Sequence, residues 1–149
     1  PTALPSARSE RELDAPAAKG VRAHLDPELF ARWNGPRYLT QRNELWDVRT
    51  GGAYRYVQVD PDGNEYAFFG SVHEVRPDEL IVQTFTFEGF PDGVSLDRLV
   101  FEDLPDGRSR LTATSLVDSF EGRDGFVASG MEVGVREGYE QLDELLAQS

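Results

Sequence analysis

The hydrophobic pattern of the chain changes twice along its length. From Leu39 to Val117, apolar and polar residues alternate in short segments that are separated by Gly, Pro and Asp. Before and after this region, apolar residues recur every three or four positions. Alternation with a period of two is typical of strands, and spacing of three and four is typical of helices. The sequence therefore predicts an α+β domain in which a run of strands lies between helical segments.

Six strands are predicted within the alternating region: Leu39 to Val48, Ala53 to Val59, Tyr66 to Val75, Leu80 to Phe87, Val94 to Asp103 and Arg108 to Val117. Turn sequences such as "DPDGNE" and "PDG" join them, because Pro presets φ and Gly accepts a positive φ. Connections this short favour antiparallel neighbours. Arg8 to Leu13 is a candidate seventh strand. We expect residues 1–7 to form a flexible arm and residues 8–149 to form a single domain.

Two short helices are predicted before the strands. The first covers Ala17 to His24, and the second lies in the stretch "LDPELFARWNGP". In this stretch Asp26 is a good N-cap and Pro27 falls at the first helical position, where its missing N–H does no harm. Asn34-Gly35-Pro36 ends the helix, because Gly accepts a left-handed conformation and Pro cannot continue a helix.

A long amphipathic helix is predicted from about Gly125 to Ala147. Its apolar positions step by three or four residues: Val127, Met131, Val135, Gly138, Leu142 and Leu145. A single helix cannot cover six or seven flat strands. We therefore expect a curved antiparallel sheet that wraps around this helix, with the two short helices closing one end. Such a packing tends to leave a cavity between helix and sheet. Gly130, Gly134 and Gly138 would let the helix lie close to the sheet or would leave room beside it.

Seven segments of the chain, in this order, resemble a known family: "RELDAP", "DPELFARWNGP", "WDVRTGGAYRYV", "DPDGNEYAFFGSVHEVRP", "LIVQTFTFEG", "RLTATS" and "ASGMEVGVREGYEQLDELL". Together they are similar to bacterial proteins related to the activator of the ninety-kilodalton heat-shock-protein ATPase. That family belongs to the START-related helix-grip (SRPBCC) superfamily, which includes birch-pollen allergens and polyketide cyclases. The resemblance runs from about Arg11 to Ala147 and implies a helix-grip fold.

The resemblance also implies a set of possible functions. Proteins of this superfamily use an internal cavity for ligand binding, lipid transfer or cyclisation, so we expect a module that binds a small hydrophobic or aromatic molecule. One alternative is a cofactor-free enzyme of the cyclase type that uses Glu74 and the pocket tyrosines as acid/base groups. The family name suggests a second alternative, a co-chaperone-like interaction module with a chaperone partner.

Charge and composition narrow the possible partners. The 149 residues carry a formal net charge of −12, which disfavours nucleic acids and anionic membrane surfaces. The chain has no cysteine, which excludes disulfides, thiolate catalysis and Cys-ligated zinc. His24 and His73 are far apart and follow no metal-binding spacing, so we expect no metal and no cofactor. We expect a soluble cytoplasmic protein that is a monomer or a homodimer.

Alternation within the strands, together with the apolar positions of the predicted helices, gives candidate residues for the cavity wall: Trp33, Tyr54, Tyr56, Phe68, Val72, Phe85, Leu111, Ala113, Ser115, Met131 and Val135. We expect Trp33 to stand at the cavity entrance and to report ligand binding, with Trp46 on a strand away from it. Glu74 is in register with the inward set of its strand, so it is a candidate acid with a raised pKa. Gly70 in mid-strand suggests that another element approaches closely. Arg98 faces either solvent or a ligand carboxylate.

Overall fold

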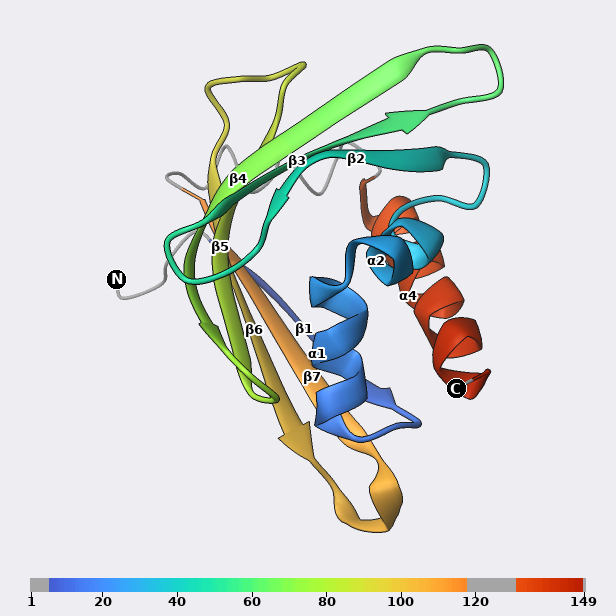
Figure 1. Ribbon diagram of the computed structural model, residues 1–149, viewed down its shortest axis with the longest axis vertical. Helices are drawn as coiled ribbons and strands as arrows, with labels where there is room; N and C mark the ends of the chain where they lie inside the picture. The colour runs from blue at the N-terminus through green and yellow to red at the C-terminus, as the bar shows by residue number, and fades with distance from the viewer. Residues whose placement is uncertain (1–5, 118–130, 149) are drawn as a thin grey trace.

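The sheet of the protein is a single curved layer of seven antiparallel strands in the order β1-β7-β6-β5-β4-β3-β2 (Figure 1). The computed structural model describes residues 6–117 and 131–148. Its strands are β1 (Ser6–Leu13), β2 (Thr40–Asp47), β3 (Ala53–Val59), β4 (Glu65–Arg76), β5 (Leu80–Phe87), β6 (Ser95–Asp103) and β7 (Ser109–Leu116). The predicted candidate strand near the N-terminus is therefore a full member of the sheet, and it begins at Ser6 and pairs with β7.

The helices α1 (Ala17–Leu25), α2 (Pro27–Trp33) and α4 (Met131–Ala147) lie on the concave side of the sheet (Figure 1). A short 3-10 turn, η1 (Pro105–Gly107), joins β6 to β7. The predicted start of α2 is confirmed, since the Asp26 carboxylate accepts hydrogen bonds from the backbone N–H groups of Glu28 and Leu29 at 3.0 and 3.2 Å. The first residues predicted for the long helix, 125–130, lie outside the described residues.

The main core lies between the three helices and the half of the sheet that contains β1, β7, β6 and β5. Leu142 of α4 is at its centre with 0% of its surface exposed. Around it pack buried residues from both layers: Leu13, Ala17, Val21, Trp33, Ile81, Phe101, Leu111 and Leu146. Packing of this kind fixes α4 against α2 and the sheet, as the predicted complementarity of helix and sheet requires.

The glycines of α4 face α2 and the turn after it. A Cβ on Gly138 would lie 2.9 Å from the Gly35 nitrogen and 3.2 Å from the Trp33 carbonyl oxygen. One turn earlier, a Cβ on Gly134 would lie 3.2 Å from the ring of Pro36. Of the two alternatives predicted for these glycines, a close approach to the sheet is wrong for Gly134 and Gly138, because the close approach is between α4 and the end of α2. Gly130 lies outside the described residues.

A β-bulge interrupts β4 at His73. Val72 pairs with Gln83, but Glu74 pairs with Val82, so one extra residue is inserted on β4. The turn between β2 and β3 pairs with backbone groups beside the bulge. The Gly51 N–H donates to the Val72 carbonyl oxygen at 2.9 Å, and the Val75 N–H donates to Thr50 Oγ1 at 2.9 Å. Every residue after the bulge therefore faces opposite to the direction that simple alternation predicts.

Candidate ligand-binding site

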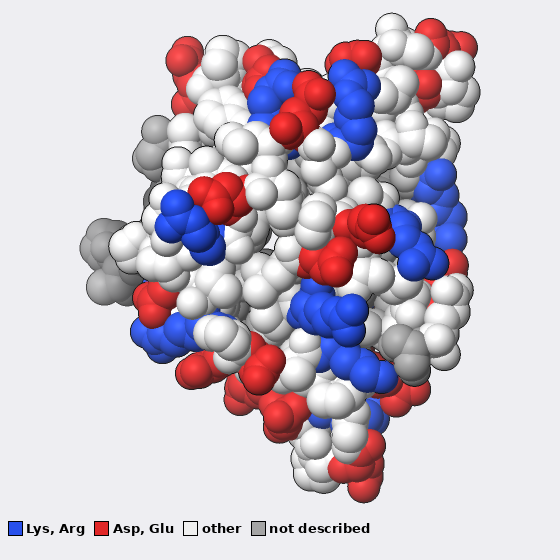
Figure 2. All heavy atoms as spheres, viewed as in Figure 1, with Lys and Arg blue, Asp and Glu red and all other residues white. Residues whose placement is uncertain are grey.

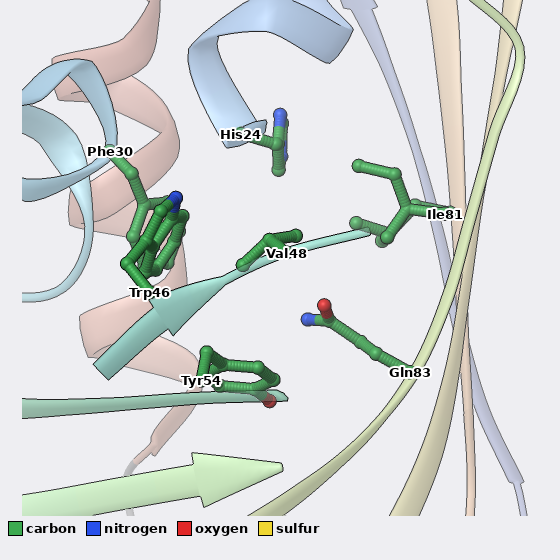
Figure 3. A pocket seen from close by; sticks show the side chains of 8 residues that line it. His24, Phe30, Trp46, Val48, Tyr54, Ile81 and Gln83 are labelled. Carbon is green, nitrogen blue, oxygen red and sulfur yellow. The ribbon is translucent and has the colours of Figure 1, made fainter. Parts of the chain in front are cut away.

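A small enclosed cavity lies between the helical layer and the concave face of the sheet. Its volume is about 20 Å³, which is room for about one water molecule. Eight residues from both layers line it: His24, Phe30, Trp46, Val48, Tyr54, Ile81, Gln83 and Leu99. Figure 3 shows these side chains converging from α1, α2 and the sheet. The wall is mostly apolar with a few polar groups, which is the composition typical of small-molecule sites.

His24, at the end of α1, is buried beside this cavity with 7% of its surface exposed. Its Nδ1 lies 2.7 Å from the Gly20 carbonyl oxygen, and since a carbonyl oxygen can only accept, Nδ1 carries the proton. Trp33 and Phe101 pack edge-on against the ring, with centroids at 4.7 and 5.2 Å. Burial lowers the pKa of His24 to about 4, although the hydrogen bond to Gly20 opposes this. The ring is therefore neutral near pH 7, with Nε2 as an unprotonated acceptor.

Aromatic rings cover the sheet beside the cavity. Tyr54, Tyr56 and Phe68 form a stack across β3 and β4, with centroid distances of 6.1 and 5.2 Å between neighbours. Phe85 continues the stack onto β5, at 5.4 Å from Phe68. Val72 is buried in the same cluster. The structure thus brings five of the sequence-predicted pocket residues together on the concave face.

Gly70 allows the Tyr54 side chain to reach across β4. The Tyr54 hydroxyl donates to the Thr84 carbonyl oxygen of β5 at 2.6 Å. A Cβ on Gly70 would lie 2.0 Å from that oxygen and 2.6 Å from the hydroxyl. The prediction of a close approach at this glycine is confirmed, and the approaching group is a tyrosine. Burial raises the pKa of Tyr54 far above its ordinary value, so the hydroxyl stays protonated as a donor.

A row of polar side chains crosses three strands next to the cavity. Gln83 of β5, Asp97 of β6 and Ser115 of β7 are register partners and therefore point to the same face. The Ser95 hydroxyl donates to Asp97 Oδ1 at 2.9 Å, and Ser115 also hydrogen-bonds this carboxylate. Burial raises the pKa of Asp97, while these two hydrogen bonds lower it. Ser115 was predicted to face inward, but Asp97 and Gln83 were missed.

The two tryptophans differ from the prediction in their relation to the cavity, although Trp46 lies on a strand as predicted. Trp33 is 5% exposed and belongs to the core, where its indole N–H donates to the Ala23 carbonyl oxygen at 2.9 Å and its ring stacks on Tyr139. Trp46, in contrast, lines the cavity, and its indole N–H donates to the Leu25 carbonyl oxygen at 2.8 Å. The prediction of Trp33 at an entrance is wrong, because the docking of α4 buries it.

The α4 residues predicted for the wall do not form part of the cavity as described. Val135 is 47% exposed, because the buried stripe of α4 passes through Gly138, Leu142 and Leu146 instead. Met131 begins α4, and its side chain lies outside the part of the chain that the structure describes. Leu111 is buried in the main core, away from the cavity lining.

Glu74 points away from the concave face. It pairs with Val82, whose neighbours Ile81 and Gln83 face the cavity, so Val82 and Glu74 share the opposite face. Glu74 also forms an ion pair with Arg76. The prediction that it is a pocket-edge acid is wrong, because the bulge at His73 turns it outward. Arg98 pairs with Val82 on the same outer face and is exposed. Of the two predicted alternatives, Arg98 therefore faces solvent and not a ligand carboxylate in the cavity.

A second hollow lies on the surface between α1 and the β4–β5 turn. Its volume is about 320 Å³, and its lining residues are Ala18, Val21, Arg22, Leu25, Asp26, Pro77 and Asp78. The face in Figure 2 carries basic and acidic side chains side by side. Among the described residues, Arg55 forms ion pairs with both Glu44 and Glu88. Within residues 6–117 and 131–148, no cluster of three potential metal ligands occurs. In the same residues, no helix has both the length and the apolar character to cross a membrane.

The curved antiparallel sheet with helices on its concave side places the protein in the class of helix-grip folds. The family model described as "Activator of Hsp90 ATPase homolog 1-like protein" matches residues 14–147. The chain therefore belongs to this family, and the resemblance noted from its sequence segments is confirmed. The comparison with curated proteins found no match.

Solved bacterial structures are similar to this chain over nearly its whole length. A solution structure of an Arthrobacter aurescens protein has a TM-score of 0.88 at 27% identity, covering 97% of this chain and 87% of that one. A crystal structure of a Chromobacterium violaceum protein has a TM-score of 0.78 at 27% identity, with coverage of 95% and 96%. A Rhodobacter sphaeroides protein at 24% identity has a TM-score of 0.88 and coverage of 99% and 96%, and it supports the fold alone.

Proposed function

We propose that the protein is a binding module for a small hydrophobic or aromatic molecule, and that the molecule binds where Trp46, Phe30 and Tyr54 meet above the concave face. The observation that carries this proposal is the enclosed cavity, whose wall is aromatic and aliphatic apart from His24, Gln83 and the tyrosine hydroxyl. Membership of a family whose fold typically binds ligands supports it. With Glu74 on the outer face, the enzyme alternative loses the acid on which it depended.

A ligand larger than water must widen the cavity. Trp46 and Val48 are only partly buried and pack on the aromatic cluster of the sheet, outside the main core, so they can move outward without disturbing that core. Phe30 packs against both the main core and this cluster and would have to shift against Trp33. Trp46 is held by the single hydrogen bond from its indole N–H to the Leu25 carbonyl oxygen, between α1 and α2. The planar ring of a ligand would then stack where the rings of Phe30 and Trp46 now lie 5.3 Å apart.

Tryptophan fluorescence tests this proposal. A panel of planar aromatic probes is titrated into the protein, and thermal unfolding is followed in parallel. We expect a bound probe to change the fluorescence of Trp46 and to raise the melting temperature, since a ligand that binds only the folded state stabilises it. Trp46→Phe should remove the fluorescence response.

Trp33→Phe is the matched control, because Trp33 is equally aromatic but is buried in the core. It should leave the fluorescence response in place. A response that survives in Trp46→Phe and disappears in Trp33→Phe would put the ligand elsewhere. No binding by any probe, with no shift in melting temperature, would contradict the proposal itself.

A further inference from the structure

The Asp97 carboxylate lies on the concave face of the sheet without a cation beside it. Odd-numbered residues of β6 face inward, since Leu99 lines the cavity and Phe101 belongs to the main core. Ser95 and Ser115 hydrogen-bond the carboxylate. Within residues 6–117 and 131–148, no basic side chain forms an ion pair with it. A carboxylate that is partly removed from water without a counterion costs free energy, so a cation bound here would stabilise the folded protein.

Arg11 of β1 also faces the helices, but its charge is committed elsewhere. Its guanidinium pairs with Asp143 of α4 and lies 5.7 Å from the centre of the Tyr139 ring. Through the register of β1, β7 and β6, Asp97 is level with Ala7, four residues away from Arg11 along β1. Four residues of strand span about 13 Å. The pairing with Asp143 therefore keeps this cation away from Asp97.

The concave face is open at the end of the sheet where Asp97 lies. Asp97, Gln83, Phe85 and Ser115 all face inward, and all four remain partly exposed. At the other end of the same strands the face is closed, and Phe101 is only 3% exposed. A ligand can therefore reach the Asp97 side chain from the concave side.

Asp97 also adjoins the aromatic site. Gln83 lines the cavity and is the register partner of Asp97. Tyr54 lines the cavity too, and Figure 3 shows it and Gln83 extending toward the same space. Burial is the main cause of the raised pKa of Tyr54, and the nearby charge of Asp97 adds to it. Phe85, the last ring of the aromatic stack, pairs with Ser95, whose hydroxyl donates to Asp97. Rings and carboxylate thus form one continuous surface.

This combination matches an ammonium group on an aromatic body. An ammonium group has three N–H donors for the carboxylate oxygens and for neighbouring acceptors such as the Ser115 hydroxyl and the Gln83 carboxamide oxygen. Aromatic ring faces attract a cation, and they also stack on the ring of a ligand. A ligand carboxylate would instead be repelled by Asp97 and would lose its hydration without a compensating cation.

We propose that Asp97 is the counterion for the ammonium group of an arylalkylamine ligand. This inference rests on the proposed function: the aromatic body of the ligand occupies the site beside Trp46 and Tyr54, and its ammonium group reaches Asp97 past Gln83. The site selects cationic aromatic compounds over neutral and anionic compounds with the same ring.

The experiment compares three probes of one ring system: tryptamine, 3-methylindole and indole-3-acetate. Calorimetry measures their dissociation constants at pH 7, in salt that screens the net charge of −12. We expect tryptamine to bind the wild type most tightly and indole-3-acetate most weakly. In Asp97→Asn the affinity ratio of tryptamine to 3-methylindole should fall about tenfold or more, as the loss of a hydrogen bond to a charged group predicts.

Glu102→Gln is the matched control, because it changes the net charge equally but lies exposed on the outer face of β6. It should leave the affinity ratio unchanged. A ratio that Asp97→Asn leaves unchanged, an equal fall in Glu102→Gln, or tighter binding of indole-3-acetate than of tryptamine overturns the inference. The proposed function still stands in these cases if 3-methylindole binds. Failure of all three probes overturns the inference, and the proposed function falls with it if no planar probe binds.

A second measurement applies should Asp97→Asn not fold. The pKa of the Asp97 carboxyl is followed in the wild type by ¹³C NMR, with and without each probe. Tryptamine must lower this pKa, because a bound ammonium group favours the charged carboxylate, and 3-methylindole must not lower it. A pKa that tryptamine leaves unchanged overturns the inference.

Discussion

Acid should destabilise the protein through His24. The buried ring has a pKa of about 4 in the folded state, against an ordinary value of 6.5. The unfolded chain therefore binds a proton between pH 6.5 and 4 that the folded protein does not bind. Above pH 6.5 the ring is neutral in both states and contributes no pH dependence. Between these values stability is lost as the pH falls, and below pH 4 the loss levels off because both states are protonated.

The size of the effect follows from the two pKa values. At about 1.36 kcal/mol for each tenfold difference in proton affinity, the interval from 6.5 to about 4 corresponds to about 3 kcal/mol. Domains of this size are typically stable by about 5–15 kcal/mol, so this loss is a large share of the total. His24 should therefore lower the stability of the protein as the pH falls from 6.5 to about 4.

Urea unfolding at a series of pH values from 4 to 8 measures this effect. The difference between the wild type and His24→Asn isolates the histidine, since acidic groups whose pKa is shifted, such as Glu88, Glu144 and Asp97, are common to both proteins. The difference should change by about 3 kcal/mol between pH 7 and 4. A pH-independent difference would refute the reasoning.

Three further predictions concern stability and are measured by urea unfolding at pH 7. Leu142→Ala should destabilise by about 2–5 kcal/mol, because it leaves a cavity in the centre of the core. Tyr54→Phe should cost about 1–3 kcal/mol, because the Thr84 carbonyl oxygen loses its donor over Gly70. Gly138→Ala should cost about 1–3 kcal/mol despite the better helix propensity of Ala, because the new Cβ forces α4 away from α2.

Each of these three predictions has its own contradicting result. A loss below about 1 kcal/mol for Leu142→Ala would mean that α4 is not docked as described. If Tyr54→Phe is neutral, water satisfies the Thr84 carbonyl oxygen equally well. If Gly138→Ala stabilises the protein, helix propensity outweighs the contact with Gly35 and Trp33. Gln148→Ala, at an exposed position just after α4, is a suitable control with little expected change.

The strands and short helices were predictable because their signals are local. Asp26 and Pro27 specify the start of α2 within a few residues, and the "PDG" and "DPDGNE" turns separate strands whose alternation is already clear. The observed bounds of β3 and β5 match the predicted bounds. Such features depend on backbone chemistry over three or four residues, so the rest of the fold does not change them.

The site was less predictable because it depends on register and packing. Nothing in the sequence around His73 signals a bulge, yet the bulge turns Glu74 from the inner to the outer face. Asp97 was missed because apolar residues flank it on both faces of β6, and only pairing with β5 and β7 shows which face is inside. Either tryptophan could line a pocket as far as the sequence shows. The docking of α4 buries Trp33 against Tyr139, and Trp46 lines the cavity.

The hydrogen-bond ladder between β4 and β5 is interrupted beside the aromatic cluster. Between β4 and β5, beside Gly70, side chains replace ladder hydrogen bonds: the Ser71 N–H donates to Thr84 Oγ1 at 2.9 Å, and the Thr84 carbonyl oxygen accepts from the Tyr54 hydroxyl. Three residues farther along β4 the ladder shifts register at the bulge. A segment held by side chains can separate without breaking a continuous ladder, so opening here requires less free energy than in β6 or β7. The amide of Ser71 should therefore exchange with solvent faster than the amides of β6 and β7, which native-state hydrogen exchange measures, and equal protection would contradict this reasoning.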